Sequence, residues 1–172
     1  MGNLLYIIGQ ILGVIAVILG FVTYQVRTQK MLLTVQIFTT LTFVLHYLLI
    51  GAWSGMALNA VAMVRNIVYA RRDLKVFSGK LWPFAFALIM GIMGLLSWQS
   101  FYSVFVILGL VINSVCMAFD DPQKIRKSIL VTSPLVLIYN ISALSVGGIV
   151  YESVAVISAL VGVLRFRKKN AQ

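Results

Sequence analysis

The chain has 172 residues, of which 61% are hydrophobic and only 10% are charged, and its mean hydropathy is +1.01. A soluble domain of this size needs more polar surface than this composition supplies, so the chain is predicted to be a membrane protein. The formal net charge of +10 does not indicate a nucleic-acid partner. Thirteen of the fourteen Lys and Arg residues lie in short breaks between apolar runs or near the C-terminus, and Arg65 is the exception. The positive-inside rule produces this distribution.

Seven apolar runs follow one another along the chain, at residues 4–25, 31–50, 54–70, 81–98, 101–119, 128–146 and 149–166. Crossing the ~30 Å hydrocarbon core takes roughly 20 helical residues, which is close to the length of each run. Helices are expected because lipid offers no partner to unpaired backbone groups, and because the runs lack the alternation of barrel strands. The first run is read as a retained helix, since no basic segment or convincing cleavage site accompanies it.

The connections between these runs alternate between basic and uncharged. Residues 26–30, 70–80 and 120–127 and the tail from Arg165 are basic, whereas the intervening connections carry no Lys or Arg. With seven spans, this alternation places the N-terminus outside and the C-terminus in the cytoplasm.

The two halves of the chain share a pattern of apolar runs and polar breaks. Ile11-Leu12-Gly13 begins the first half and Ile107-Leu108-Gly109 begins the second, while Gln29-Lys30 and Gln123-Lys124 follow at the polar breaks. The alternative is that short multi-span proteins share one hydropathy profile without any duplication. A duplication of three spans on each side of a single span is typical of transporters.

The predicted fold is therefore an all-α polytopic membrane protein with seven transmembrane helices in a 3+1+3 arrangement of parallel repeats. The fourth span would reverse the chain direction, and Pro83 would lie in the first turn of its helix. The predicted divisions are residues 1–72 for the first three-helix repeat, 73–100 for the linker with the inversion helix, and 101–172 for the second repeat with its basic tail.

Polar side chains inside spans are candidate functional residues, because a charge at the centre of a helix costs roughly 2.5–3.5 kcal/mol on insertion scales. Arg65 lies six residues before Arg71, about 9 Å deeper at 1.5 Å per residue. It either snorkels to the cytoplasmic interface or has another structural role, or it takes part in solute binding or gating. Asn59, Met63 and Asn66 share one helical face, which we expect to look into the bundle.

Five further residues complete the candidate solute path. His46 is either a hydrogen-bond partner between helices or a proton carrier. Glu152 is either an interfacial carboxylate at a helix N-terminus or a partner of His46 or a solute. Asn113 and Asn140 either bind solute hydroxyls or join helices. Trp53 belongs to an interfacial aromatic belt or stacks on a ring-shaped solute.

Several familiar chemistries are missing from the sequence. It contains no nucleotide-binding loop, no His-Glu-x-x-His motif and no Cys/His metal spacing, and its single cysteine, Cys116, excludes an intrachain disulfide. We therefore expect no catalytic residues, no metal, no cofactor and no enzyme activity. Asp120 and Asp121 lie beside Lys124, where they form a solvated charge cluster, cap the sixth span or bind a cation.

The 3+1+3 plan, with a Gln-containing break after the first helix of each triplet, resembles the SWEET and PQ-loop transporter superfamily. Pro122-Gln123 is the Pro-Gln pair of that superfamily, whereas the first triplet has Tyr24-Gln25 without a proline. The proline acts there as a hinge, so the resemblance implies Pro122, Gln123 and Gln25 as hinge candidates. The missing first proline argues against symmetric rocking of the two halves.

The segment from His46 to Asn59, followed by Arg65 and Asn66, resembles the signature of the bacterial inner-membrane YgjV-like family. The likeness to this family extends over nearly the whole chain. This likeness implies a bacterial inner-membrane location. The wider superfamily implies transport of a small polar solute such as a sugar, nucleoside or vitamin. SWEET-like proteins use Asn and Trp near mid-membrane, and Asn59, Asn66 and Trp53 are the nearest analogues here.

The leading functional hypothesis is a transporter or facilitator in the lipid bilayer that works by alternating access between the two three-helix bundles. Its candidate path is lined by His46, Trp53, Asn59, Arg65, Asn66, Asn113, Asn140 and Glu152. The alternative is a non-transporting membrane adaptor or sensor, whose basic loops recruit a partner or anionic lipid. The sequence leaves open whether the protein forms a homo-oligomer.

Overall fold

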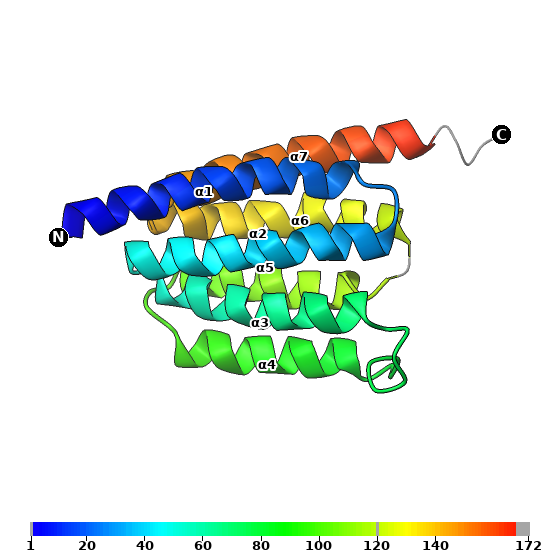
Figure 1. Cartoon of the computed structure of the whole chain (residues 1–172). Helices are drawn as coiled ribbons and strands as arrows, with labels where there is room; N and C mark the ends of the chain where they lie inside the picture. The colour runs from blue at the N-terminus through cyan, green and yellow to red at the C-terminus, as the bar shows by residue number, and fades with distance from the viewer. Residues whose placement is uncertain (1, 120, 168–172) are drawn as a thin grey trace.

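The computed structural model describes residues 2–119 and 121–167, which form seven α-helices. Neighbouring helices in the chain run in opposite directions, so α1 begins at one end of the bundle and α7 ends at the other (Figure 1). The prediction of an all-helical fold is confirmed. The helices are α1 (Gly2–Gln25), α2 (Gln29–Ile50), α3 (Trp53–Ala70), α4 (Trp82–Leu96), α5 (Ser103–Cys116), α6 (Pro122–Ser142) and α7 (Val146–Arg167).

Among the described residues, three helical segments are long and apolar enough to cross a membrane: Leu4–Thr23, Gln29–Ile50 and Val146–Arg165. Helices α4 and α5 are apolar but shorter. The outer face of α1 is an unbroken apolar surface that includes Leu4, Ile7, Ile11, Val14 and Ile18. Water-soluble proteins rarely expose contiguous apolar patches of this extent, whereas lipid covers them without cost.

Six of the helices form a closed ring in which each packs against two neighbours. The order around the ring is α1, α2, α3, α5, α6 and α7, and α7 returns to α1. Helix α4 packs outside this ring against α3 and α5 (Figure 1). The contacts within α1–α3 recur within α5–α7, because α1 packs on α2 as α5 packs on α6, and α2 packs on α3 as α6 packs on α7. The two contacts between the halves also correspond: α1 packs on α7, and α5 packs on α3.

The start of α2 and the start of α6 have the same construction, 93 residues apart. Thr28 is the N-cap of α2 and its side chain accepts a hydrogen bond from a backbone N–H, as the side chain of Asp121 does for α6. Leu32 N donates to Thr28 O over 3.0 Å, and Ile125 N donates to Asp121 O over 3.3 Å. Each cap satisfies donors that a helix N-terminus leaves without a partner.

The turns that follow α2 and α6 are also matched. Gly51 and Leu144, again 93 residues apart, both adopt positive φ, at 76° and 50°. The same backbone hydrogen bond closes each turn: Ala52 N donates to Tyr47 O (2.9 Å), and Ser145 N donates to Asn140 O (3.0 Å). The two halves therefore share local geometry at both ends of their second helices.

Helix α6 differs from the span predicted at 128–146, because it begins at Pro122 and ends at Ser142. The Asp121 cap and the proline in the first turn start the helix six residues before the apolar run. Pro122 and Gln123 therefore lie within the first turn of α6, rather than in a flexible break between helices. Hydropathy locates the part of a helix that faces lipid, whereas the cap decides where the helix begins.

Other predicted boundaries differ by fewer residues. Helix α5 is shorter than the predicted 101–119, and α7 begins at Val146 rather than at residue 149. Pro83 lies in the first turn of α4 as predicted. Pro134 lies inside α6, where it removes one backbone N–H donor from the helix.

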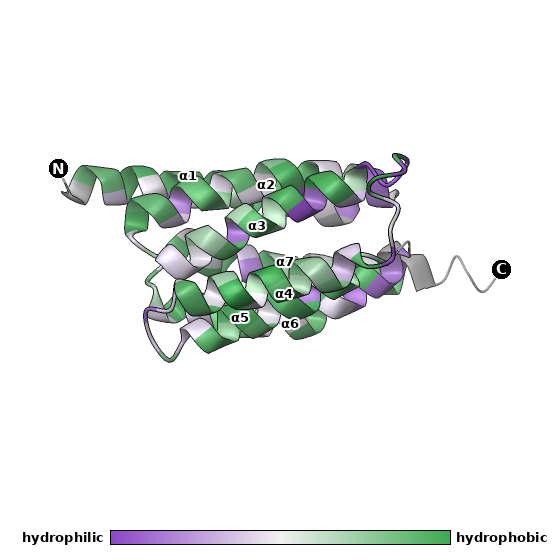
Figure 2. Ribbon diagram, turned by 90° about the horizontal axis from the view of Figure 1, so that it is seen from below, coloured by the Kyte–Doolittle hydropathy of each residue, from purple (hydrophilic) through white to green (hydrophobic). Residues whose placement is uncertain are grey.

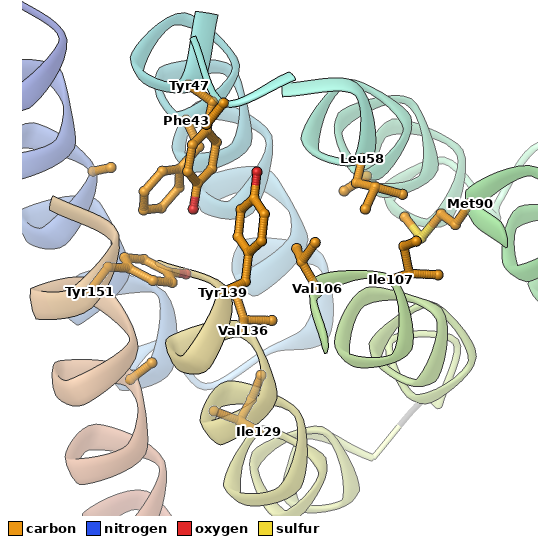
Figure 3. Packing of buried hydrophobic residues seen from close by; sticks show 14 of the residues in the cluster. Phe43, Tyr47, Leu58, Met90, Val106, Ile107, Ile129, Val136, Tyr139 and Tyr151 are labelled. Carbon is orange, nitrogen blue, oxygen red and sulfur yellow. The ribbon is translucent and has the colours of Figure 1, made fainter. Parts of the chain in front are cut away.

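Two clusters of buried apolar side chains fill the interior. The larger one includes Phe43, Tyr47, Leu58, Tyr139 and Tyr151, and it joins the ring helices to α4 through Met90 (Figure 3). The smaller cluster lies among the beginnings of α2, α4 and α6 and the ends of α3 and α5; its buried members are Leu32, Leu33, Val68, Tyr69, Phe86, Met117 and Ile125.

The smaller cluster lies near one end of the bundle, where hydrophilic residues gather (Figure 2). The α1–α2, α3–α4 and α5–α6 connections meet at this basic end, with exposed Arg27, Lys30, Arg71, Lys75, Lys80, Lys124 and Lys127. Arg126 is an exception, because it is buried and its Nη2 donates to Val26 O over 3.2 Å. Arg126 thereby links the first turns of α6 to the α1–α2 connection.

Candidate functional site

A cavity of about 60 Å³ lies inside the helix ring. This volume holds only a few water molecules. All the ring helices except α1 line it, and most of the lining side chains carry a polar group. Those polar residues are Gln36, Thr39, Thr40, Tyr47, Asn59, Arg65, Asn113, Thr132, Ser133, Tyr151 and Glu152.

The cavity lining reflects the same 93-residue correspondence as the turns. Five pairs of lining residues are separated by this interval: Thr39 and Thr132, Thr40 and Ser133, Gln36 and Ile129, Phe43 and Val136, and Asn59 and Glu152. The first two pairs are hydroxyl residues in both halves. The cavity therefore lies between matching faces of the two halves, and Asn59 opposite Glu152 is where they differ in charge.

Arg65 lies at the cavity and is 1% exposed. Its Nε and Nη2 donate to Asn66 Oδ1 over 3.1 and 2.9 Å, and its Nη1 donates to Asn113 Oδ1 over 3.3 Å. These bonds hold the guanidinium between α3 and α5. The side chain lies inside the bundle, so it does not snorkel to the cytoplasmic interface.

Glu152 lies at the cavity and is 9% exposed. Helix α7 begins six residues before it, and the Ser145 side chain accepts a hydrogen bond from Gly148 N over 3.0 Å at that start. The interpretation of Glu152 as a carboxylate in the first turn of a helix is therefore wrong. Ser133 and Tyr47 are its polar neighbours, and no basic side chain in the described part of the chain forms an ion pair with it.

His46 is fully buried outside the cavity. Its Nδ1 is 2.7 Å from Gly9 O, and its Nε2 is 2.6 Å from Ser145 Oγ. The imidazole thus joins α2 to α1 and to the residue before α7. Of the two roles predicted for it, the structure supports a hydrogen-bond partner between helices, and the ring does not pair with Glu152.

The remaining three candidates also lie outside the cavity. Asn140 Oδ1 accepts a hydrogen bond of 2.6 Å from the Tyr47 hydroxyl. Asn66 is fully buried against Arg65, and Trp53 is 49% exposed at the start of α3. The position of Trp53 suits an interfacial belt. The structure therefore brings Asn59, Arg65, Asn113 and Glu152 together at the cavity, whereas the other four do not line it and Asn66 reaches it only through its hydrogen bonds with Arg65.

Two tyrosines lie between the central cavity and a second cavity at the end opposite the basic connections. Tyr47 lines the central cavity, Tyr139 lines the second one of about 160 Å³, and their ring centroids are 6.4 Å apart. Gly55 N donates to the Tyr139 hydroxyl over 3.0 Å, which ties this ring to α3. The two neighbouring rings thus lie one at each cavity.

The predicted hinge residues make contacts near the basic end. Gln25 Nε2 donates to Ser158 Oγ over 2.9 Å, and Gln123 Nε2 donates to Val163 O over 3.4 Å. Both contacts attach a neighbouring helix to α7. Asp121 caps α6, which was one of the interpretations of the acidic pair, whereas Asp120 and the basic tail beyond residue 167 lie outside the described residues.

Sequence reasoning missed the hydroxyl residues of the cavity. Thr39-Thr40 in α2 and Thr132-Ser133 in α6 are adjacent polar pairs near the middle of apolar runs. Their matching positions in the two halves were the signal that could have identified them. Among the described residues, no group of three His, Cys, Asp or Glu side chains is placed to hold a metal ion.

A model of the Imp-YgjV family, described as a bacterial inner membrane protein, matches residues 7–170. The chain belongs to this family. The match begins within α1 and includes all of α2–α7 and the residues that line the central cavity. As a YgjV-family member, the protein is an inner membrane protein of bacteria, in agreement with its apolar exterior. No curated protein and no solved structure matches the chain.

Proposed function

We propose that this YgjV-family protein is a transporter or facilitator that moves a small polar solute across the inner membrane. The observation that carries the proposal is the central cavity, which brings Asn59, Arg65, Asn113 and Glu152 together inside an apolar bundle. Polar and ionisable groups are costly inside a membrane and mark solute or ion pathways. An adaptor that acts through its basic loops has no need of such an interior.

The proposed architecture is a 3+1+3 duplication, with α1–α3 and α5–α7 as parallel repeats and α4 as the inversion helix. The recurring packing order and the matched caps and turns at both ends of α2 and α6 support it. All seven helices would cross the membrane, with the basic end in the cytoplasm and the N-terminus outside. The concentration of Lys and Arg at one end supports this orientation.

In this architecture a barrier would lie on each side of the central cavity. The Tyr47 and Tyr139 rings would form the barrier on the outer side, and the cluster around Leu33 and Met117 would form the barrier on the cytoplasmic side. Alternating access would open these two barriers in turn. Opening at the basic end requires the contacts of Gln25 and Gln123 with α7 to break, so the proposed hinge lies at the ends of α1 and α6.

The test is uptake of radiolabelled methylammonium, glycine and glycerol into proteoliposomes that contain the full chain. Asn59→Leu fills the cavity with apolar atoms, and we expect it to abolish most of the uptake. Ser153→Leu is the matched control, because Ser153 is exposed on α7 beside Glu152 and adds no group to the cavity. Equal uptake by both variants would refute the path, and uptake of no solute by the wild type would favour the adaptor.

A further inference from the structure

We infer that the central cavity recognises a protonated amino group, bound by the Glu152 carboxylate beside the aromatic side chains of Phe43, Tyr47 and Tyr151. This inference rests on the proposed function, because it names the class of solute for the same cavity. It departs from a neutral sugar or nucleoside, and it follows from the chemistry of the half of the cavity that contains Glu152.

The charge of Glu152 is the first element of the argument. It is the only glutamate in the chain, and the other acidic residues of the described part, Asp73 and Asp121, lie outside the helices. The residue is 9% exposed, and the hydroxyl groups of Ser133 and Tyr47 are among the polar groups that interact with it. A buried carboxylate without a cationic partner costs several kcal/mol, and a bound cation removes that cost.

The aromatic side chains are the second element. The Phe43 ring centroid is 4.7 Å from that of Tyr151 and 5.5 Å from that of Tyr47, and all three residues line the same cavity as Glu152. Figure 3 shows these three side chains gathered where α2 faces α7. Aromatic rings attract cations within about 6 Å, and ammonium recognition sites combine several rings. A carboxylate beside three rings therefore favours a cation over a neutral solute.

The asymmetry of the cavity is the third element. Asn59, at the position that corresponds to Glu152, cannot ionise, so Glu152 is the group at this level of the cavity that can take a negative charge when a cation binds. Arg65 lies six residues further along α3, about 9 Å away along the helix axis at 1.5 Å per residue. The amino group of a solute would point toward Glu152, and a carboxylate on the same solute would point toward Arg65.

The size of the cavity limits the solute to a few heavy atoms in this conformation. The same ammonium chemistry has two sources, a simple amine or a small zwitterion such as an amino acid. Methylammonium represents the first source and glycine the second. Glycerol, which has hydroxyl groups and no charge, represents the neutral polar solutes.

The experiment measures binding of these three probes by titration calorimetry to the full chain in lipid nanodiscs. We expect methylammonium or glycine to bind the wild type, with Glu152→Gln weakening the affinity at least tenfold and Ser153→Ala leaving it unchanged. Phe43→Leu should weaken it about threefold, because one ring contributes a modest part of the attraction. Tighter binding of glycine than of methylammonium identifies the zwitterion.

Two outcomes overturn the inference: glycerol binds while both amines do not, or the amines bind Glu152→Gln as well as they bind the wild type. If Glu152→Gln does not fold, Glu152→Asp replaces it, because this variant keeps the carboxylate on a shorter side chain. Loss of all selectivity for amines over glycerol in the folded Glu152→Asp variant would also overturn the inference. Uptake of radiolabelled methylammonium and glycine separates the two proposals. Glu152-dependent binding without uptake would refute the transport proposal alone. Uptake of glycerol without amine binding would refute the ammonium-site inference alone.

Discussion

The matched turns after α2 and α6 differ in one respect that can be tested by substitution. Leu144 has a φ of 50°, and a residue with a Cβ pays roughly 1–2 kcal/mol in the left-handed region. Leu144→Gly removes this strain, and the greater flexibility of glycine offsets about 0.5–1 kcal/mol of the gain. Leu144 is 70% exposed, so the substitution loses little packing. We expect the free energy of unfolding to rise by about 0.5–1 kcal/mol.

The reverse substitution, which adds a Cβ to the left-handed residue, can be made at the matching turn in the first half of the chain. Gly51 has a φ of 76°, and a Cβ added there meets no atom within 4 Å. Gly51→Ala therefore isolates the backbone strain, and we expect it to lower the free energy of unfolding by about 1 kcal/mol. Gly91 in α4 is the matched control, because its added Cβ also meets no atom within 4 Å while its backbone is helical. Gly91→Ala should be neutral or stabilising.

The assay is thermal unfolding of the purified full chain in detergent micelles. A change of 1 kcal/mol corresponds to a Tm shift of about 2–4 °C for a chain of this size. The reasoning is refuted if Gly51→Ala is as stable as the wild type, or if Leu144→Gly lowers Tm while Gly91→Ala does not. Either result would mean that the two turns do not share the left-handed conformation.

Three further predictions concern contacts between the ring helices. His46→Ala removes two buried hydrogen bonds that join α2 to α1 and α7, and we expect it to cost about 1–3 kcal/mol in the same unfolding assay; an unchanged Tm would contradict this. Gly13→Val places a Cβ 2.7 Å from Gly147 Cα and should destabilise the α1–α7 contact by about 1–3 kcal/mol, which a neutral Gly13→Val would disprove. Tyr139→Phe removes the acceptor for Gly55 N, so amide hydrogen exchange there should accelerate, and unchanged exchange would argue against the hydrogen bond.

The candidate site shows where residue type alone is informative. Arg65, Asn59, Asn113 and Glu152 were selected because they are polar within apolar runs, and they meet at one cavity. Asn140 was selected by the same criterion and instead binds the Tyr47 hydroxyl. The polarity of a side chain predicts that it turns away from lipid. It does not predict whether the polar group faces a cavity or bonds to a neighbouring helix, because both places satisfy its hydrogen bonds.

Helix boundaries were also predicted only in part. The apolar run of α6 was recognised, and a cap by the acidic pair was one of the alternatives, but the predicted span began only at residue 128, because the first turns carry Lys124 and Lys127 in a region of low hydropathy. The predicted position of Glu152 within its helix was wrong for a related reason. The predicted start of the last helix put Glu152 near a terminus, whereas the turn at Leu144 and Ser145 starts the helix earlier and places Glu152 deeper.

The sequence by itself determined the membrane class, the family, the helical fold and the basic end of the bundle. These properties depend on hydropathy and charge summed along each segment, and they hold however the helices pack. Only the tertiary structure decided which polar residues meet. The direction of each side chain depends on the rotation of its helix within the ring, and a change of one residue in register turns a helix by about 100°. The meeting of Glu152 with Asn59, Phe43 and Tyr47 at one cavity depends on that packing and on no local pattern.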